Sequence, residues 1–124
     1  MITPATLGKK ERLKSRKSLD QLFSEGQKFS VAPFRIFWLP VTEKGLRASV
    51  GVSAKNFKRS VDRNRIKRQI RESYRLQKAE LVAKVDSSEK GLNIFFIYTE
   101  KELPAFIVLK EKMQVALKKI QSQL

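Results

Sequence analysis

The sequence predicts a single α+β domain, a sandwich in which helices pack on a small and mainly antiparallel sheet. Its 124 residues can bury one hydrophobic core and are too few for two. Apolar residues make up 41% of the chain, which is enough for a packed core. Their spacing changes between the helical and the strand period in the order α-β-β-α-β-α, with room for a further strand before the second helix. We therefore expect residues 1–124 to fold around one core.

The chain opens with a basic arm and a first helix. Residues 1–14 predict an irregular arm, because they combine a proline and a glycine with little apolar periodicity. The helix that follows has Ser15 or Ser18 as its N-terminal cap and Gly26 as its stop. Its apolar face consists of Leu19, Leu22 and Phe23.

Two strands are expected next. Residues 28–40 are rich in aromatic and β-branched side chains and predict a strand, in which Pro33 indicates a bend or an edge position. Residues 46–53 predict a second strand, and residues 42–45 form a turn between the two. We therefore expect these strands to pair as an antiparallel hairpin.

The second half of the chain predicts a long helix, a strand and a last helix. Residues 61–84 lack glycine and proline and place apolar residues along one stripe, which predicts the longest helix. Residues 92–99 are nearly all apolar, as is typical of a central strand buried on both faces. Pro104 opens a last helix, whose apolar residues recur at helical spacing.

The net charge of +15 and the pI of about 10.4 indicate a polyanionic partner, either a nucleic acid or an anionic membrane surface. Histidine and cysteine are absent, which excludes disulfides, thiolate and histidine catalysis, and the usual zinc sites. No apolar run is long enough to cross a bilayer, and no hydrophobic signal core precedes the first lysine. We therefore expect a cytoplasmic protein.

The basic charge is concentrated in one internal segment. Residues 55–75 contain nine lysines and arginines against two acidic residues, Asp62 and Glu72. A folded domain rarely keeps such repulsion unless a polyanion offsets it. Charge balance within this segment explains the two carboxylates better than acid-base catalysis does.

A helical wheel places six polar and basic residues of this segment side by side, next to the apolar stripe of the same helix. One side of the helix can therefore dock on the sheet while the adjacent side presents cations to solvent. Arginine predominates among them, and its planar fork binds a phosphate bidentately or stacks on a base. The six residues are Arg63, Asn64, Lys67, Arg68, Arg71 and Arg75.

The segment from Arg63 to Glu72 reads RNRIKRQIRE and follows Lys55 and a basic linker. It resembles the RNR helix of the bacterial ribonuclease P protein subunit. The resemblance extends to Arg12-Leu13, to the first helix, to the aromatic strand near Phe37 and to the strand over 93–98. It implies a ribosomal protein S5 domain 2-like fold, with a left-handed βαβ crossover around the RNR helix that departs from the usual right-handed rule.

The resemblance implies a non-catalytic protein subunit of an endoribonuclease, in which RNA carries out the hydrolysis. In that family the RNA subunit holds the Mg²⁺ ions that cut the 5′ leader from precursor tRNA, and the protein binds both RNAs. The implied partners are therefore the ribonuclease P RNA and precursor tRNA, with no membrane and no obligate protein partner. The resemblance implies no organic cofactor, and no catalytic residue or metal site in the protein itself.

The family pattern assigns two groups of contact residues in this sequence. The RNA subunit would be bound by Arg59, Arg63, Asn64, Arg65, Lys67, Arg68 and Arg71. The single-stranded leader would pass through a cleft between the first helix and the sheet, where rings stack on bases. This cleft would be lined by Leu19, Phe23, Phe37 and Lys55.

Three positions depart from the family pattern. Leu19 stands where an aromatic ring is usual, Phe37 stands where tyrosine is common, and Ala54 replaces the first of a frequent Lys-Lys pair. These departures bear on one stack and one hydroxyl contact to the leader, whereas the RNR segment is intact.

The residues alone leave other interpretations open. Phe23 and Phe37 could serve as plain core packing, and we interpret Trp38 and residues 95–98 as sheet core. A structural RNA-binding protein, such as a small ribosomal protein, would share the basic composition. A membrane-surface or DNA-binding module is the third class, although the long helix shows neither an insertion face nor a recognition-helix pattern.

Overall fold

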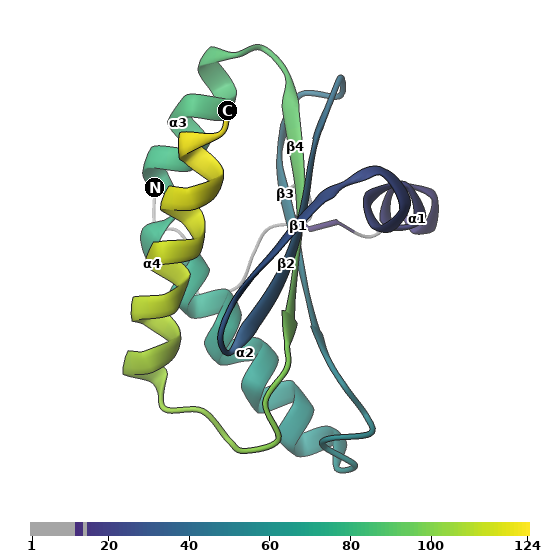
Figure 1. Cartoon of the computed structure of the whole chain (residues 1–124), viewed down its shortest axis with the longest axis vertical. Coiled ribbons are helices and arrows are strands. Elements are labelled where there is room, and N and C mark those ends of the chain that lie inside the picture. The colour runs from purple at the N-terminus through teal and green to yellow at the C-terminus, as the bar shows by residue number, and fades with distance from the viewer. Residues whose placement is uncertain (1–11, 14) are drawn as a thin grey trace.

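The computed structural model describes residues 12, 13 and 15–124. The predicted α+β class is confirmed, and a third strand precedes the second helix. Of the predicted arm over 1–14, only residues 12 and 13 are among the described residues. In chain order the elements are α1 (Arg16–Glu25), β1 (Gln27–Val31), β2 (Phe34–Val41), β3 (Gly45–Val52), α2 (Ser60–Gln77), α3 (Ala79–Ser87), β4 (Gly91–Tyr98) and α4 (Phe106–Ser122) (Figure 1).

The strands of the described part form one sheet in the order β1-β2-β4-β3. β1 pairs with β2, and β2 pairs with β4, in antiparallel orientation. β3 pairs with β4 in parallel orientation. β4 is therefore central, as predicted, because its nearly all-apolar sequence suits burial on both faces.

Two predictions about the strands are wrong. The segment 28–40 is a hairpin of β1 and β2 that reverses at Ala32 and Pro33, and not one bent strand. Residues 46–53 do not pair with this segment, because β4 lies between β2 and β3. Strands that are neighbours in sequence usually pair, so only the long-range pairing of β4 could have revealed the true order.

β3 and β4 run parallel and are joined through α2 and α3, so this connection is the βαβ crossover that the resemblance implies. Its left-handed sense stays a prediction. The single helix predicted over 61–84 is wrong, because the helix breaks at Lys78 without any glycine or proline. Just before the break, Gln77 Nε2 donates hydrogen bonds to the carbonyl oxygens of Ser73 and Lys110, which ties the end of α2 to α4.

The described elements form three layers. α2, α3 and α4 cover one face of the sheet, and α1 lies on the opposite face against β2 and β4 (Figure 1). The core lies between the sheet and the layer of α2, α3 and α4, where alternate strand residues meet buried helix residues such as Ile70 and Met113. Trp38, Phe96 and Tyr98 belong to this core, as predicted.

α1 is fixed at both ends and by one buried side chain. Of the two candidate caps, Ser15 performs the role, because its Oγ accepts a hydrogen bond of 3.3 Å from the Ser18 backbone N–H. At the other end, a Cβ on Gly26 would lie 2.4 Å from the Leu22 carbonyl oxygen, so glycine is required there. Leu22 is fully buried, whereas Phe23 beside it is 44% exposed.

Residues 12 and 13 lie along the outer edge of β3. Arg12 forms an isolated parallel bridge with Ala48, and the Leu13 N–H donates to the Ala48 carbonyl oxygen at 3.1 Å. This bridge covers part of a strand edge that would otherwise be open to another strand. Residues 12 and 13 of the predicted irregular arm therefore contact the edge of the sheet through one isolated bridge and do not form a strand.

Candidate nucleic-acid interface

α2 buries one side in the core and turns the adjacent side to solvent. Ile66, Ile70 and Tyr74 are buried at the spacing predicted for the apolar stripe. The residues predicted to bind the RNA subunit all lie on α2 or, for Arg59, at its N-terminal cap position, and we call them the α2 basic surface. Arg59, Asn64, Arg65 and Arg68 are exposed, and Arg63, Lys67 and Arg71 are half-buried.

Arg63 differs from its neighbours because its guanidinium is already bound within the protein. Its Nη1 donates to the carbonyl oxygens of Phe57 at 2.7 Å and of Lys58 at 2.9 Å. These bonds hold the segment that leads into α2 against the first turn of the helix. Arg63 therefore positions this end of the basic surface, while Arg65 and Arg68 extend into solvent.

The acidic residues of this segment are paired with arginines. Arg75 forms a two-point contact with Glu72, in which Nη2 lies 2.6 Å from Oε1 and Nε lies 3.1 Å from Oε2. The hydrogen bonds and, to a smaller degree, the charge of Arg75 hold the pKa of Glu72 below its ordinary value, against the raising effect of burial. Asp62 Oδ2 lies 3.8 Å from Arg59 Nε. These contacts agree with charge balance within the segment.

Arg71 connects α2 with the edge of the sheet. Partial burial and then the positive charge of Arg12 lower the pKa of the Arg71 guanidinium. Arg12 stands on the outer edge of β3, so the positive charge continues from α2 onto this edge. A phosphate group would relieve the repulsion between two such cations.

Three phenylalanine rings gather on the face of the sheet that carries α1. The Phe23 ring lies 5.1 Å from the rings of both Phe37 and Phe95, in edge-to-face geometries of 89° and 67°. Phe23 is exposed, and the other two rings are half-buried. We call these three residues the aromatic surface. The structure thus joins the two predicted aromatic residues of the leader cleft, and the rings themselves occupy the space between α1 and the sheet.

Phe95 was missed by the sequence interpretation, which assigned residues 95–98 to the sheet core. Phe95 and Ile97 point to the α1 face, because side chains alternate along β4 and the core side is taken by Phe96 and Tyr98. The nearly all-apolar sequence of β4 conceals this alternation. A signal exists only in the sheet register, in which Phe95 lies opposite Phe37.

The other two predicted cleft residues do not join the ring cluster. Leu19 is half-buried on α1, on the same side of that helix as Phe23. Lys55 is exposed in the turn between β3 and α2, where its backbone N–H donates to Ser53 Oγ at 3.1 Å. Ala54 is exposed in the same turn. The structure therefore places Lys55 on the path from the sheet to the α2 basic surface.

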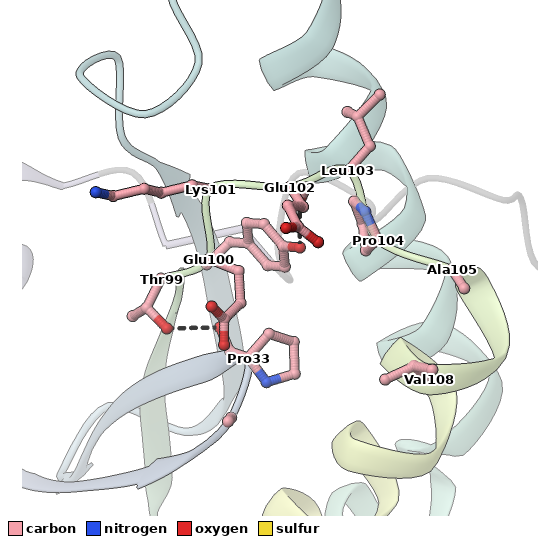
Figure 2. Close-up of a pocket in the computed structure, with 11 residues that line it drawn as sticks. Pro33, Thr99, Glu100, Lys101, Glu102, Leu103, Pro104, Ala105 and Val108 are labelled. Carbon is pink, nitrogen blue, oxygen red and sulfur yellow. Dashed lines mark hydrogen bonds between the residues drawn. The ribbon is translucent and has the colours of Figure 1, made fainter.

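A cavity of about 630 Å³ lies between the end of β4 and the start of α4, away from every predicted contact residue. Figure 2 shows Glu100 and Glu102 at this cavity and the bond of 3.0 Å that Thr99 Oγ1 donates to the Pro33 carbonyl oxygen. Burial and then the charges of Glu100 and Glu102 raise the pKa of Tyr98. The two carboxylates outnumber the one lysine of the lining, Lys101, so the net negative charge of this cavity does not fit the polyanionic partner that the composition indicates.

The described residues offer no built metal site. No group of three or more histidine, cysteine, aspartate or glutamate side chains comes together within the described part of the chain. The carboxylates closest in sequence to the α2 basic surface, Asp62 and Glu72, are paired with arginines. The expectation that Mg²⁺ is held mainly by RNA stays a prediction.

Comparison with known proteins identifies the chain. The family model for Ribonuclease P matches residues 7–121. The chain belongs to the ribonuclease P protein family. It is 38% identical over 125 residues to the ribonuclease P protein component of Porphyromonas gingivalis, with 97% of this chain and 91% of the relative covered. A match to the ribonuclease P protein component of Desulfovibrio desulfuricans, at 34% identity over 76 residues, covers 60% of this chain and 58% of that relative.

Solved ribonuclease P proteins share the fold. The Thermotoga maritima protein superimposes with a TM-score of 0.70 at 26% identity, covering 88% of this chain and 96% of that one. A mutant of the Staphylococcus aureus protein gives a TM-score of 0.72 at 20% identity and covers 91% of this chain and 90% of its own. The second likeness shows the fold alone.

Family membership settles the broad function. The chain is a protein component of ribonuclease P, the endoribonuclease of tRNA processing, and associates with the RNA subunit of that enzyme. The alternatives of a structural ribosomal protein and of a DNA-binding or membrane-surface module are therefore set aside. No helix within the described residues is long and apolar enough to cross a membrane.

Proposed function

We propose that this chain binds the catalytic RNA through the α2 basic surface and the 5′ leader of precursor tRNA through the aromatic surface. It thereby promotes endonucleolytic removal of the leader and formation of the mature tRNA 5′ end. The observation that carries this proposal is the separation of a cationic helix face from a cluster of rings on the other side of the sheet.

The α2 basic surface suits a folded RNA. Its solvent-facing residues lie on one rigid helix whose other side is buried in the core, so the spacing between cations is fixed before binding. Arginine forks bind phosphate oxygens at two points, and release of counterions from the RNA backbone favours association. Asn64, exposed among the arginines, adds a donor and an acceptor for a sugar hydroxyl or a base edge.

The aromatic surface suits unpaired bases. Single-stranded RNA is recognised by stacking of splayed bases on aromatic side chains, with cations along the backbone. Phe23 presents 44% of its surface to solvent, held in place by Phe37 and Phe95 beneath it. Lys55, in the turn after β3, would bind a leader phosphate.

We assign hydrolysis to the RNA subunit. The chain has no histidine or cysteine, and its described residues assemble no group of three or more potential metal ligands. Mg²⁺ held mainly by the RNA subunit would activate the attacking water and stabilise the leaving oxygen. The protein's own residues bind and orient the two RNAs, which raises the effective concentration of the scissile bond at the RNA active site.

The decisive experiment is cleavage of a leader-bearing precursor tRNA by a bacterial ribonuclease P RNA at low Mg²⁺, with and without this protein. We expect strong stimulation of cleavage, and no cleavage when the RNA subunit is omitted. Intact binding of the RNA subunit without stimulation would contradict the proposal. Cleavage by the protein alone would contradict the assignment of hydrolysis to RNA.

A further inference from the structure

A polar part of the α1 face adjoins the aromatic surface at the edge of the sheet. Lys28 lies directly opposite Phe37 in the register of β1 and β2, and Ser30 lies directly opposite Arg35. Residues paired in this way share a face of the sheet, as do residues two apart on one strand. Lys28, Ser30 and Arg35 therefore stand on the α1 face, beside the aromatic surface. Phe29 points to the other face and packs against the core.

α1 leaves this part of the face open. The helix packs against β2 and β4, and β1 is an edge strand of the described sheet. Lys28, Ser30 and Arg35 are all exposed, so their side chains are accessible to a ligand. Together with Phe29 they line a hollow of about 240 Å³. This volume lies below the range for drug-sized ligands and suits one small group, such as a phosphate, better than a whole nucleotide.

The charge at this hollow comes from two cations that form no ion pair. The four strands of the described sheet contain no aspartate and no glutamate. Their only other cation, Arg47, is paired with Glu43 at 3.2 Å. No ion pair of the described residues involves Lys28 or Arg35. The hollow is therefore positively charged and favours an anion.

The three polar side chains can bind the same anionic group. Lys28 and Arg35 are diagonal neighbours across the pair of strands, with Cα atoms about 7–8 Å apart. The arginine fork donates to two oxygens of a phosphate, and the lysine ammonium adds a compact positive charge. Ser30 adds a hydroxyl donor. This set of donors matches a phosphodiester group, which carries one negative charge and offers oxygen acceptors.

The place of the hollow in the sheet gives a bound single strand its direction. Lys28, Phe37 and Phe95 lie in one row across β1, β2 and β4. β1 and β3 are the two edges of the described sheet, about 14 Å apart at the usual strand spacing. Lys55 follows β3, on the way to the α2 basic surface. A strand of RNA that starts at Lys55 and stacks its bases on the rings therefore reaches the β1 edge.

We propose that the hollow at Lys28, Ser30 and Arg35 binds a phosphodiester group of the 5′ leader, beyond the nucleotides that stack on the aromatic surface. The inference rests on the proposed function and adds a phosphate-binding point to the leader path, on the side away from the α2 basic surface. Because phosphates carry no sequence information, this site favours long leaders over short ones whatever their bases.

The test compares holoenzyme binding of two precursor tRNAs, one with a leader of about ten nucleotides and one with a leader of about two. Arg35→Thr removes the cation and places a residue that suits a strand. It should bind the long-leader precursor about tenfold more weakly and the short-leader precursor unchanged, because one charge-assisted hydrogen-bonding group is lost. Arg35→Lys keeps the charge and should recover part of this loss. Lys112→Ala removes one charge from α4 and should bind both precursors like the unaltered chain.

Neutral methylphosphonate linkages locate the contact on the leader. One phosphate of the long leader is replaced at a time, and replacement at one position beyond the stacked nucleotides should weaken binding to the unaltered chain. The same replacement should cost less in Arg35→Thr, because both changes remove one shared contact. Equal losses in the two proteins at every leader position would overturn the inference.

The remaining outcomes separate this inference from the proposed function. Normal binding of the long-leader precursor by Arg35→Thr, or an equal loss for both leaders, would overturn the inference. An equal loss together with a lower melting temperature would assign Arg35 to the fold and would also overturn it. Stimulation of precursor cleavage is measured on the unaltered chain. Intact stimulation without an effect of Arg35 overturns this inference alone, and absent stimulation overturns the proposed function.

Discussion

The α2 basic surface and the aromatic surface differ in both composition and origin. The first is a row of cations on one helix, set by the helical period of a single segment. The second assembles Phe23, Phe37 and Phe95 from α1, β2 and β4, so it exists only in the folded chain. The comparison teaches that a phosphate-binding surface can be recognised from one segment of sequence, whereas a surface of aromatic rings from several elements depends on sheet topology.

The largest effect on RNA affinity is expected when cations are removed from the α2 basic surface. Replacing Arg65 and Arg68 together with alanine removes two exposed guanidiniums, each worth about 1.5–3 kcal/mol when bonded to a phosphate. Affinity for the RNA subunit should fall at least about a hundredfold, and the slope of log affinity against log salt should decrease by about 2. The double variant Lys112→Ala and Lys118→Ala removes the same charge from α4 and is the matched control. Equal losses in both double variants would show that only total charge matters.

A smaller effect is expected at the second surface. Phe23→Ala removes an exposed ring, and base stacking on such a ring contributes about 1–3 kcal/mol. The holoenzyme should bind leader-bearing precursor tRNA about fivefold or more weakly, with affinity for mature tRNA and for the RNA subunit unchanged. Affinities are measured by equilibrium binding. If assembly with the RNA subunit is lost instead, Phe23 is a packing residue.

Arg63 is expected to contribute to stability, unlike the exposed arginines of the α2 basic surface. Arg63→Ala removes two hydrogen bonds to the carbonyl oxygens of Phe57 and Lys58, so the free energy of unfolding should fall by about 1–3 kcal/mol. Arg65→Ala, two residues along the helix and exposed, should leave stability within about 0.5 kcal/mol. Urea denaturation of both variants measures their free energies of unfolding. Equal stabilities would mean that the bonds of Arg63 contribute nothing.

The smallest effect is expected on stability, from the Glu72–Arg75 ion pair near the C-terminal end of α2. The pKa of Glu72 is lowered in the folded state by Arg75, so this pair stabilises the fold above the ordinary carboxyl pKa of 4.5 and loses that contribution as the pH falls through the lowered value. Glu72→Gln should therefore be less stable than the unaltered chain at pH 7 and should differ little from it at pH 2. Thermal unfolding of both proteins at pH 7 and pH 2 measures this difference in stability. If the variant is less stable by the same amount at both pH values, the loss comes from packing and not from the charge of Glu72.

Much of the helical part of the fold follows from the sequence. Ser15, Gly26 and the buried Ile66 and Ile70 were predicted from cap chemistry and the helical period, because these signals act over a few residues. The break at Lys78 was not predicted, since it depends on contacts of Gln77 with α4 that no local pattern records.

The sheet and the base-binding residues were less predictable. β4 was expected to be central, but its insertion between β2 and β3 is a pairing over a long sequence distance. The position of Phe95 follows from that insertion. The α2 basic surface was visible in the sequence, while the aromatic surface was complete only once the register was known.

The most direct test of the division between the two surfaces is a pair of photo-crosslinking experiments on the assembled holoenzyme with precursor tRNA. The photoreactive amino acid p-benzoylphenylalanine replaces Phe37 in one protein and Asn64 in the other. We predict that the probe at position 37 crosslinks to the 5′ leader and that the probe at position 64 crosslinks to the RNA subunit. Crosslinks from both positions to the same RNA, or in the reverse order, would contradict the account.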